Sequence, residues 1–212
     1  MSGAALAPLL SGAALAPLLF AAALAPLGWV GWLAGNNLLG ANPIEALVRK
    51  TGWWALVFLL ITLCLTPLRR LSGKSGFIRY RRMAGLFAFF YAMVHLTAYV
   101  AVDQFFAWKF IWKDIVKHPF ITLGMTAFVL QVPLAVTSTR GWIKRLGKKW
   151  ALLHRLVYVA AVLGVTHYFW MVKADVRGPL AFAIMLALLL GLRYKPRRKL
   201  PPLQPQPATR SL

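Results

Sequence analysis

Long apolar stretches follow one another along the chain, and short polar segments separate them. With a rise of about 1.5 Å per residue, a helix over each stretch crosses most of a hydrocarbon layer about 30 Å thick. The pattern therefore predicts an all-α integral membrane protein, a six-helix transmembrane bundle. The predicted spans are residues 13–34, 52–68, 83–102, 120–136, 150–172 and 179–194.

The N-terminal region contains a repeated segment. Residues 2–10 read SGAALAPLL, residues 11–19 repeat them, and residues 20–28 are a degenerate third copy. Prolines recur within these copies and predict a kinked helix. A basic region typical of a signal peptide is missing, because no Lys or Arg precedes Arg49. We expect a low-complexity segment over residues 1–12, the six-helix domain over 13–194 and a basic, proline-rich tail over 195–212.

Composition excludes several classes of protein. The chain is 60% hydrophobic and 14% charged, well above the usual apolar share of about 45–50%, which excludes an ordinary soluble enzyme. Its net charge of +21 is spread over short loops between apolar stretches. That arrangement reports membrane orientation rather than nucleic-acid binding. The single cysteine, Cys64, excludes an internal disulfide and an iron–sulfur cluster, and we interpret it as a small buried apolar residue.

The charged residues predict the orientation of the bundle. The loops between spans 2 and 3 and between spans 4 and 5, together with the tail, carry 17 basic residues, and the opposite loops carry 7. By the positive-inside rule, both termini are predicted to be cytoplasmic. The four acidic residues all fall on the opposite, outer side and are Glu45, Asp103, Asp114 and Asp175.

Three of the four histidines lie within predicted spans, where ionisable groups indicate function. His95 and His167 are predicted to lie at a similar depth on different helices, in the outer half of the membrane. Two imidazoles at the same depth on different helices suit axial ligation of a b-type heme. His154 lies about 20 Å away along the membrane normal. A histidine that only hydrogen-bonds a neighbouring helix is the alternative for each, whereas zinc lacks a third ligand. His118 precedes Pro119 in an outer loop, and we interpret it as solvated.

Several segments match a known family in order and spacing. They are NPIEALVRKTGWWAL (42–56), TLCLTPLRR (62–70), RRMAGLFAFFYAMVH (81–95), DIVKHPFITLG (114–124), PLAVTSTRGWIKRLGKKWALLHRLVY (133–158) and HYFWMVK (167–173). Through them the sequence resembles the heme-binding membrane subunits of the periplasmic methionine-sulfoxide reductase system, the YedZ/MsrQ family of the ferric-reductase-like transmembrane group. The resemblance covers roughly residues 42–178.

The resemblance implies two stacked hemes, each held by one histidine of span 3 and one of span 5. The usual separation of 13 residues on span 5 is present between His154 and His167. It corresponds to about 220° of helix rotation, so we expect the helix to tilt or widen locally. On span 3 the usual separation is 14 residues, but Arg81 stands 14 residues before His95. Either the inner heme is absent, or His154 holds it with a weak or unusual partner such as Arg81. A loop charge that only marks orientation is the other interpretation of Arg81.

The resemblance also implies an electron source and a partner. Only 18 residues follow Tyr194, without the glycine-rich motif of an NADPH domain, so electrons are expected from membrane quinol or a separate flavoprotein. By resemblance the donor is the quinone pool, FMN is an associated cofactor, and the acceptor is a periplasmic molybdopterin-containing methionine-sulfoxide reductase subunit. The chain is then an electron-transfer subunit of the bacterial inner membrane that supports repair of oxidised proteins, with no catalytic residues of its own.

Two alternatives remain at this point. One is a heme-linked transmembrane ferric or metal reductase without a dedicated partner, and the other is a non-heme transporter. The outer segment Asp103–Pro119 is a candidate docking surface for the partner, or else an interfacial anchor, because it is rich in aromatic residues. These aromatic residues are Phe105, Phe106, Trp108, Phe110 and Trp112.

Overall fold

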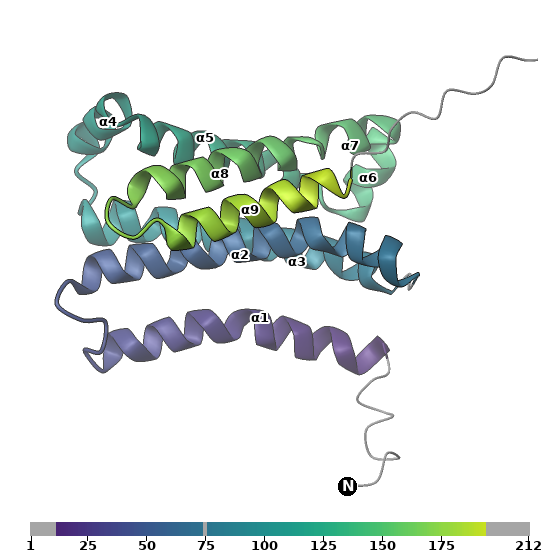
Figure 1. The fold of residues 1–212 in the computed structure, drawn as a ribbon, viewed down its shortest axis with the longest axis horizontal. Coiled ribbons are helices and arrows are strands. Elements are labelled where there is room, and N and C mark those ends of the chain that lie inside the picture. The colour runs from purple at the N-terminus through teal and green to yellow at the C-terminus, as the bar shows by residue number, and fades with distance from the viewer. Residues whose placement is uncertain (1–11, 74–75, 194–212) are drawn as a thin grey trace, which may run out of the picture.

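The computed structural model describes residues 12–73 and 76–193, and within them the fold is entirely helical (Figure 1). The predicted tail over 195–212, and residues 1–11 of the predicted N-terminal segment, lie outside the described residues. The helices are α1 (Gly12–Gly35), α2 (Pro43–Ser72), α3 (Phe77–Thr97), the π-helix η2 (Ala98–Asp103), α4 (Trp108–Lys117), α5 (Pro119–Val136), α6 (Arg140–Leu146), α7 (Lys148–Leu153), α8 (Leu156–Met171) and α9 (Arg177–Gly191).

Five helices of the described chain are long and apolar enough to cross a membrane. They are Leu15–Gly35, Pro43–Ser72, Phe77–Asp103, Pro119–Val136 and Lys148–Met171. The sixth predicted span corresponds to α9, which has 15 residues and a length of about 22 Å, less than a full hydrocarbon layer. The all-helical class is therefore confirmed with five spans, and a sixth crossing stays a prediction.

α2 is longer at both ends than the apolar stretch from which it was predicted. At its start, the side chain of Asn42 accepts a hydrogen bond from the backbone N–H of Glu45, and Pro43 occupies the first helical position. At its end, Gly73 adopts a left-handed conformation, with φ of 69°, and its N–H bonds the carbonyl of Arg69. These caps extend the helix into polar residues that hydropathy alone assigns to loops.

The long helices lie side by side along one direction, so the bundle has two ends (Figure 1). The acidic end carries the α1–α2 loop, α4 and the α8–α9 loop, and all four acidic residues belong to it. The basic end carries α6, α7 and the α2–α3 connection. The sequence predicts that the acidic end faces outward.

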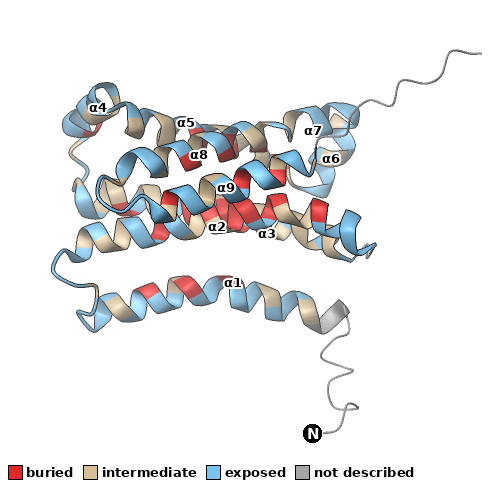
Figure 2. Cartoon of the chain, in the orientation of Figure 1, coloured by how far each residue is buried: buried red, intermediate tan, exposed pale blue. Residues whose placement is uncertain are grey.

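The core lies where α2 and α3 meet the other helices (Figure 2). α2 packs most extensively against α3, and α5 packs most extensively against α8. α1 lies at the edge of the bundle, and the hydroxyl of Tyr91 on α3 attaches it. That hydroxyl donates to the Ala23 carbonyl at 2.8 Å and accepts from the Leu27 N–H at 3.2 Å. The hydroxyl therefore stands between a carbonyl and an N–H that would otherwise bond each other within the helix. This site lies beside Pro26, and α1 continues past that proline.

Three details of the predicted elements differ in the structure. The predicted span 150–172 is confirmed by Lys148–Met171, but a turn at residues 154–155 divides it into α7, which ends at Leu153, and α8, which begins at Leu156. The predicted outer loop contains the ten-residue helix α4. Cys64 is half-buried rather than buried, since it lies at the margin of the core cluster.

Candidate heme-binding site

His95 and His167 lie next to each other although 72 residues separate them in the sequence. His95 is in the last turn of α3, and His167 is near the end of α8. Their ring centroids are 6.3 Å apart, and the ring planes make an angle of 67°. The structure therefore confirms the predicted matched depth of these two imidazoles.

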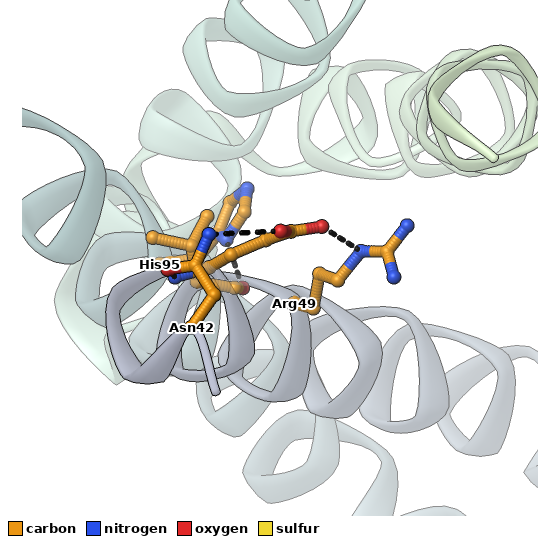
Figure 3. A network of polar contacts seen from close by, with 5 residues as sticks. Asn42, Arg49 and His95 are labelled. Atoms are coloured by element: carbon orange, nitrogen blue, oxygen red, sulfur yellow. Dashed lines mark hydrogen bonds and ion pairs between the residues drawn. The ribbon is translucent and has the colours of Figure 1, made fainter. Parts of the chain in front are cut away.

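A backbone carbonyl fixes each of the two imidazoles. Nδ1 of His95 lies 2.9 Å from the Val48 carbonyl oxygen, and Nδ1 of His167 lies 2.6 Å from that of Phe120. Figure 3 shows His95 against the first turns of α2, beside the polar contacts of Asn42 and Arg49. Because a carbonyl oxygen only accepts hydrogen bonds, both Nδ1 atoms carry the hydrogen. Each Nε2 then keeps its lone pair, and neutral imidazoles held in this way are good metal ligands.

A glycine lies against each imidazole. A Cβ atom at Gly52 would lie 3.0 Å from both Cε1 and Nδ1 of His95. A Cβ atom at Gly124 would lie 3.0 Å from the same two atoms of His167. Real Cβ contacts are rarely this short, so a larger residue at either position displaces the ring or the helix.

The two histidines are held by equivalent arrangements. One set is Val48, Gly52 and His95, and the other is Phe120, Gly124 and His167. Each residue of the second set follows its counterpart in the first set by 72 positions. α2 and α3 build the first set, and α5 and α8 build the second. The same carbonyl–glycine–imidazole arrangement therefore occurs twice, on two helix pairs that run in the same direction.

Both histidines and both glycines line a cavity of about 910 Å³. This volume falls within the range of about 300–1,000 Å³ that is usual for small-molecule and cofactor sites. Most of the other lining residues are apolar or aromatic and include Trp29, Trp54, Leu56, Met125 and Phe128. The cavity therefore suits a flat, largely apolar cofactor.

The donor set fits a heme better than a bare metal ion. Two imidazoles that bind opposite sides of one metal through bonds of about 2 Å have ring centroids about 6 Å apart, close to the separation of His95 and His167. A protein zinc site needs three or four ligands. Within the part of the chain that the structure describes, no cluster of three or more His, Cys, Asp or Glu side chains could hold a metal ion.

His154 and Arg81 lie apart from this pair, towards the basic end. His154 occupies the turn between α7 and α8, and its ring stacks on Trp150 with centroids 3.9 Å apart. Its Nδ1 contacts the Trp150 carbonyl at 3.1 Å, whereas its buried Nε2 has no hydrogen-bond partner in the described chain. The helix is broken at His154 and is a regular α-helix from Leu156 to His167, so the expected tilt or local widening stays a prediction.

Arg81 is not a loop residue. α3 begins at Phe77, so Arg81 lies within the helix, and its side chain is half-buried. The interpretation of Arg81 as a loop charge is therefore wrong as to its location.

His118 lies outside the cavity, as the sequence predicts. Its side chain is 50% exposed, and Nε2 lies 3.7 Å from a carboxylate oxygen of Asp114. The aromatic residues of the neighbouring segment are also exposed, at 57–74% for Phe105, Phe106, Trp108, Phe110 and Trp112. This surface is available for contact with a membrane or with a protein.

Sequence comparison gives a consistent picture. The profile of the ferric-reductase-like transmembrane component matches residues 51–165, which include Gly52, His95, Gly124 and His154. Three relatives carry the name protein-methionine-sulfoxide reductase heme-binding subunit MsrQ. The relative from Rhodospirillum rubrum is 61% identical over 159 residues, or 74% of this chain and 76% of the relative. That from Xanthomonas campestris pv. campestris is 52% identical over 169 residues, or 78% of each chain. That from Xanthomonas oryzae pv. oryzae is 48% identical over 183 residues, or 82% of this chain and 84% of the relative.

Proposed function

Because the chain belongs to the MsrQ family of heme-binding membrane subunits, within the ferric-reductase-like transmembrane group, we propose that it is a b-type cytochrome that supplies electrons to a methionine-sulfoxide reductase. The observation that carries this proposal is the pair His95 and His167 in one cavity, with each Nδ1 on a backbone carbonyl. A heme bound there supplies a one-electron carrier within the bilayer.

His95 and His167 would be the axial ligands of this outer heme. Val48 and Phe120 would hold the ligand rings in one tautomer, and Gly52 and Gly124 would leave room for them. His154 would be a ligand of an inner heme, with Arg81 as a second cofactor-binding residue. The buried, unpartnered Nε2 of His154 supports this second site.

We place the chain in the bacterial inner membrane, with the acidic end towards the periplasm. Electrons would come from membrane quinol and go to a periplasmic, molybdopterin-containing methionine-sulfoxide reductase subunit that repairs oxidised proteins. FMN would be a further cofactor, as the resemblance to the family implies. The exposed aromatic segment at the acidic end, which includes Trp108 and Trp112, would be the docking surface.

A test in nanodiscs separates this function from its alternatives. We expect the purified protein to show the visible spectrum of a six-coordinate b-type heme, to be reduced by a quinol analogue, and to be reoxidised by the purified periplasmic reductase with methionine sulfoxide. Reoxidation by ferric or cupric chelates, with none by the reductase, would support the metal-reductase alternative. A purified protein without a heme spectrum would refute the cytochrome function.

Reporter fusions test the proposed orientation. A fusion after Lys199 should report a cytoplasmic location, and an insertion at Lys113 in α4 should report a periplasmic one, because 17 basic residues mark the first side against 7 on the other. Alkaline phosphatase and green fluorescent protein give opposite readouts on the two sides. Phosphatase activity from the Lys199 fusion would contradict the proposed topology.

A further inference from the structure

A second cavity, of about 600 Å³, lies at the acidic end of the bundle. The last residues of α3 and the π-helix η2 form one wall, and Phe106 together with α4 forms another. Met125 of α5 completes the lining. The volume is that of a small-molecule site, and none of the proposed heme ligands lines it.

Three residues line both this cavity and the heme cavity. They are Leu96, Tyr99 and Met125. Leu96 directly follows the proposed ligand His95, and Met125 directly follows Gly124, which lies against His167. A residue that lines both cavities separates their contents by no more than its own side chain. A redox-active ligand in the second cavity would therefore lie close enough to the heme cavity for direct electron transfer.

The second cavity has an apolar and uncharged lining. In the part of the chain that the structure describes, none of its lining residues is Asp, Glu, Lys, Arg or His. A ligand with a phosphate or carboxylate group would lack a cationic partner here. The lining offers instead the hydroxyls of Thr97 and Tyr99 and the aromatic rings of Phe106, Trp108 and Trp112. These groups suit a neutral ligand with a planar ring.

The hydroxyl of Tyr99 limits the chemistry of that ligand further. It donates a hydrogen bond to Oδ2 of Asp114 at 3.3 Å, so towards a ligand its oxygen acts as an acceptor. The ligand must then be a donor, as a hydroxyl is. Oδ1 of the same carboxylate lies 3.7 Å from Nε2 of His118, whose side chain is 50% exposed. Tyr99, Asp114 and His118 thus form a path for protons from the cavity lining to the solvent.

The backbone beside the cavity is irregular. η2 is a π-helix, and the non-glycine residues Phe105 and Phe106 that follow it have positive φ angles of 45° and 58°. π-helical turns and residues in the left-handed region concentrate at functional sites. Tyr99 and Phe106 of this segment both line the cavity, so the irregular backbone shapes its wall.

We propose that the second cavity binds the ring of a membrane quinol and that Asp114 receives the protons of that quinol through Tyr99. The inference rests on the proposed function, which supplies ferric heme in the neighbouring cavity as the oxidant. Oxidation of the quinol to the quinone breaks two O–H bonds and releases two protons and two electrons. The electrons leave one at a time to the heme, which the periplasmic reductase reoxidises between them. The protons leave by way of Asp114 and His118 on the acidic side.

Anaerobic stopped-flow reduction of the purified protein in nanodiscs tests this site. Decylubiquinol is the donor, and dithionite is a reductant that needs no binding site. Tyr99→Phe keeps the ring and removes the hydroxyl, and it should slow heme reduction by the quinol by about tenfold or more while reduction by dithionite is unchanged. Tyr80→Phe, near the start of α3 at the basic end, is the matched control and should equal the wild type with both reductants.

Two further variants separate quinol binding from proton transfer. Ala101→Trp places an indole in the cavity and should raise the quinol concentration for half-maximal rate by about tenfold or more. Asp114→Asn keeps the shape of the side chain but accepts no proton, so it should lower the maximal rate by about tenfold or more and leave that concentration nearly unchanged. A variant that is merely misfolded would differ from the wild type in its α-band and in its reduction by dithionite.

The outcomes distinguish this site from the function on which it rests. A wild-type protein that dithionite reduces and the quinol does not would overturn both the site and the quinol donor, but not the cytochrome. Reduction by the quinol at the wild-type rate in folded Tyr99→Phe, Ala101→Trp and Asp114→Asn would overturn the site alone. Loss of quinol-driven reduction in these variants, with dithionite reduction intact, is the result that the proposal predicts.

Discussion

Replacement of His95 or His167 by alanine should remove the outer heme almost completely. Each change takes away one of the two imidazoles whose rings lie 6.3 Å apart in the cavity. Loss of an outer-shell partner typically costs about 10–100-fold in metal affinity, and loss of a ligand should cost more. Reduced-minus-oxidised spectra and heme-to-protein ratios of the purified variants measure the effect. Because the two ligands are held equivalently, both variants should lose the heme to a similar extent.

Two other histidines provide the controls for this experiment. His118→Ala should keep the wild-type spectrum, because that side chain is half exposed and lies outside the cavity. His154→Ala should keep the outer heme and affect only an inner one, since His154 stacks on Trp150 towards the basic end. Full retention of heme in His95→Ala, or its loss in His118→Ala, would show that the ligand assignment is wrong.

The lengths of the apolar stretches and the loop charges carried most of the information about the fold. The lengths of the apolar stretches were sufficient to predict five of the spans, because bilayer thickness fixes a narrow range of helix length. They did not predict the helix break at His154 or the helix α4, since both depend on local backbone geometry and on packing. Hydropathy also missed the extra turns of α2, where the Asn42 cap and Gly73 set the ends.

For the candidate site, the sequence predicted the histidines but not the glycines that lie against them. Histidines within apolar helices are rare enough to notice, and their depth follows from counting residues, so the sequence predicted that His95 and His167 lie at one level of the bundle. Gly52 and Gly124 were missed, because a glycine in a membrane helix is common and only the fold shows what lies opposite it. The equal separation of 43 residues between each glycine and its histidine was the available signal.

Arg193 was missed for a different reason. The sequence counted it among the basic residues that set orientation, because it directly follows an apolar helix. The structure shows its guanidinium bonded to Tyr158 and to the carbonyl of Leu63, 130 residues away in the sequence. A charge that only marks orientation and a charge that bonds neighbouring helices together look the same in sequence, and only the contacts of the side chain distinguish them.

Substitution of Gly52 or Gly124 should weaken heme binding although neither residue has a side chain that could touch a cofactor. The new Cβ of Gly52→Ala would meet the His95 ring at 3.0 Å, on the edge that carries Nδ1, and Gly124→Ala would do the same to His167. The imidazole must then move away from its carbonyl partner, which loosens the orientation of Nε2. Loss of such an outer-shell constraint predicts a fall of about 10–100-fold in heme affinity, and valine at either position should have a larger effect.

The control for this prediction is Gly85→Ala on α3, where the new Cβ would lie 3.6 Å from Thr62, an ordinary contact. That variant should bind heme like the wild type and gain helix stability of about 1 kcal/mol. Hemin titration of the apoprotein measures affinity, and electron paramagnetic resonance of the oxidised protein reports the ligand geometry. If Gly52→Ala and Gly124→Ala match Gly85→Ala in both measurements, the imidazoles are not constrained by these glycines. A shifted resonance spectrum with reduced affinity would instead show that close contact between helix backbone and ligand ring sets the geometry of the site.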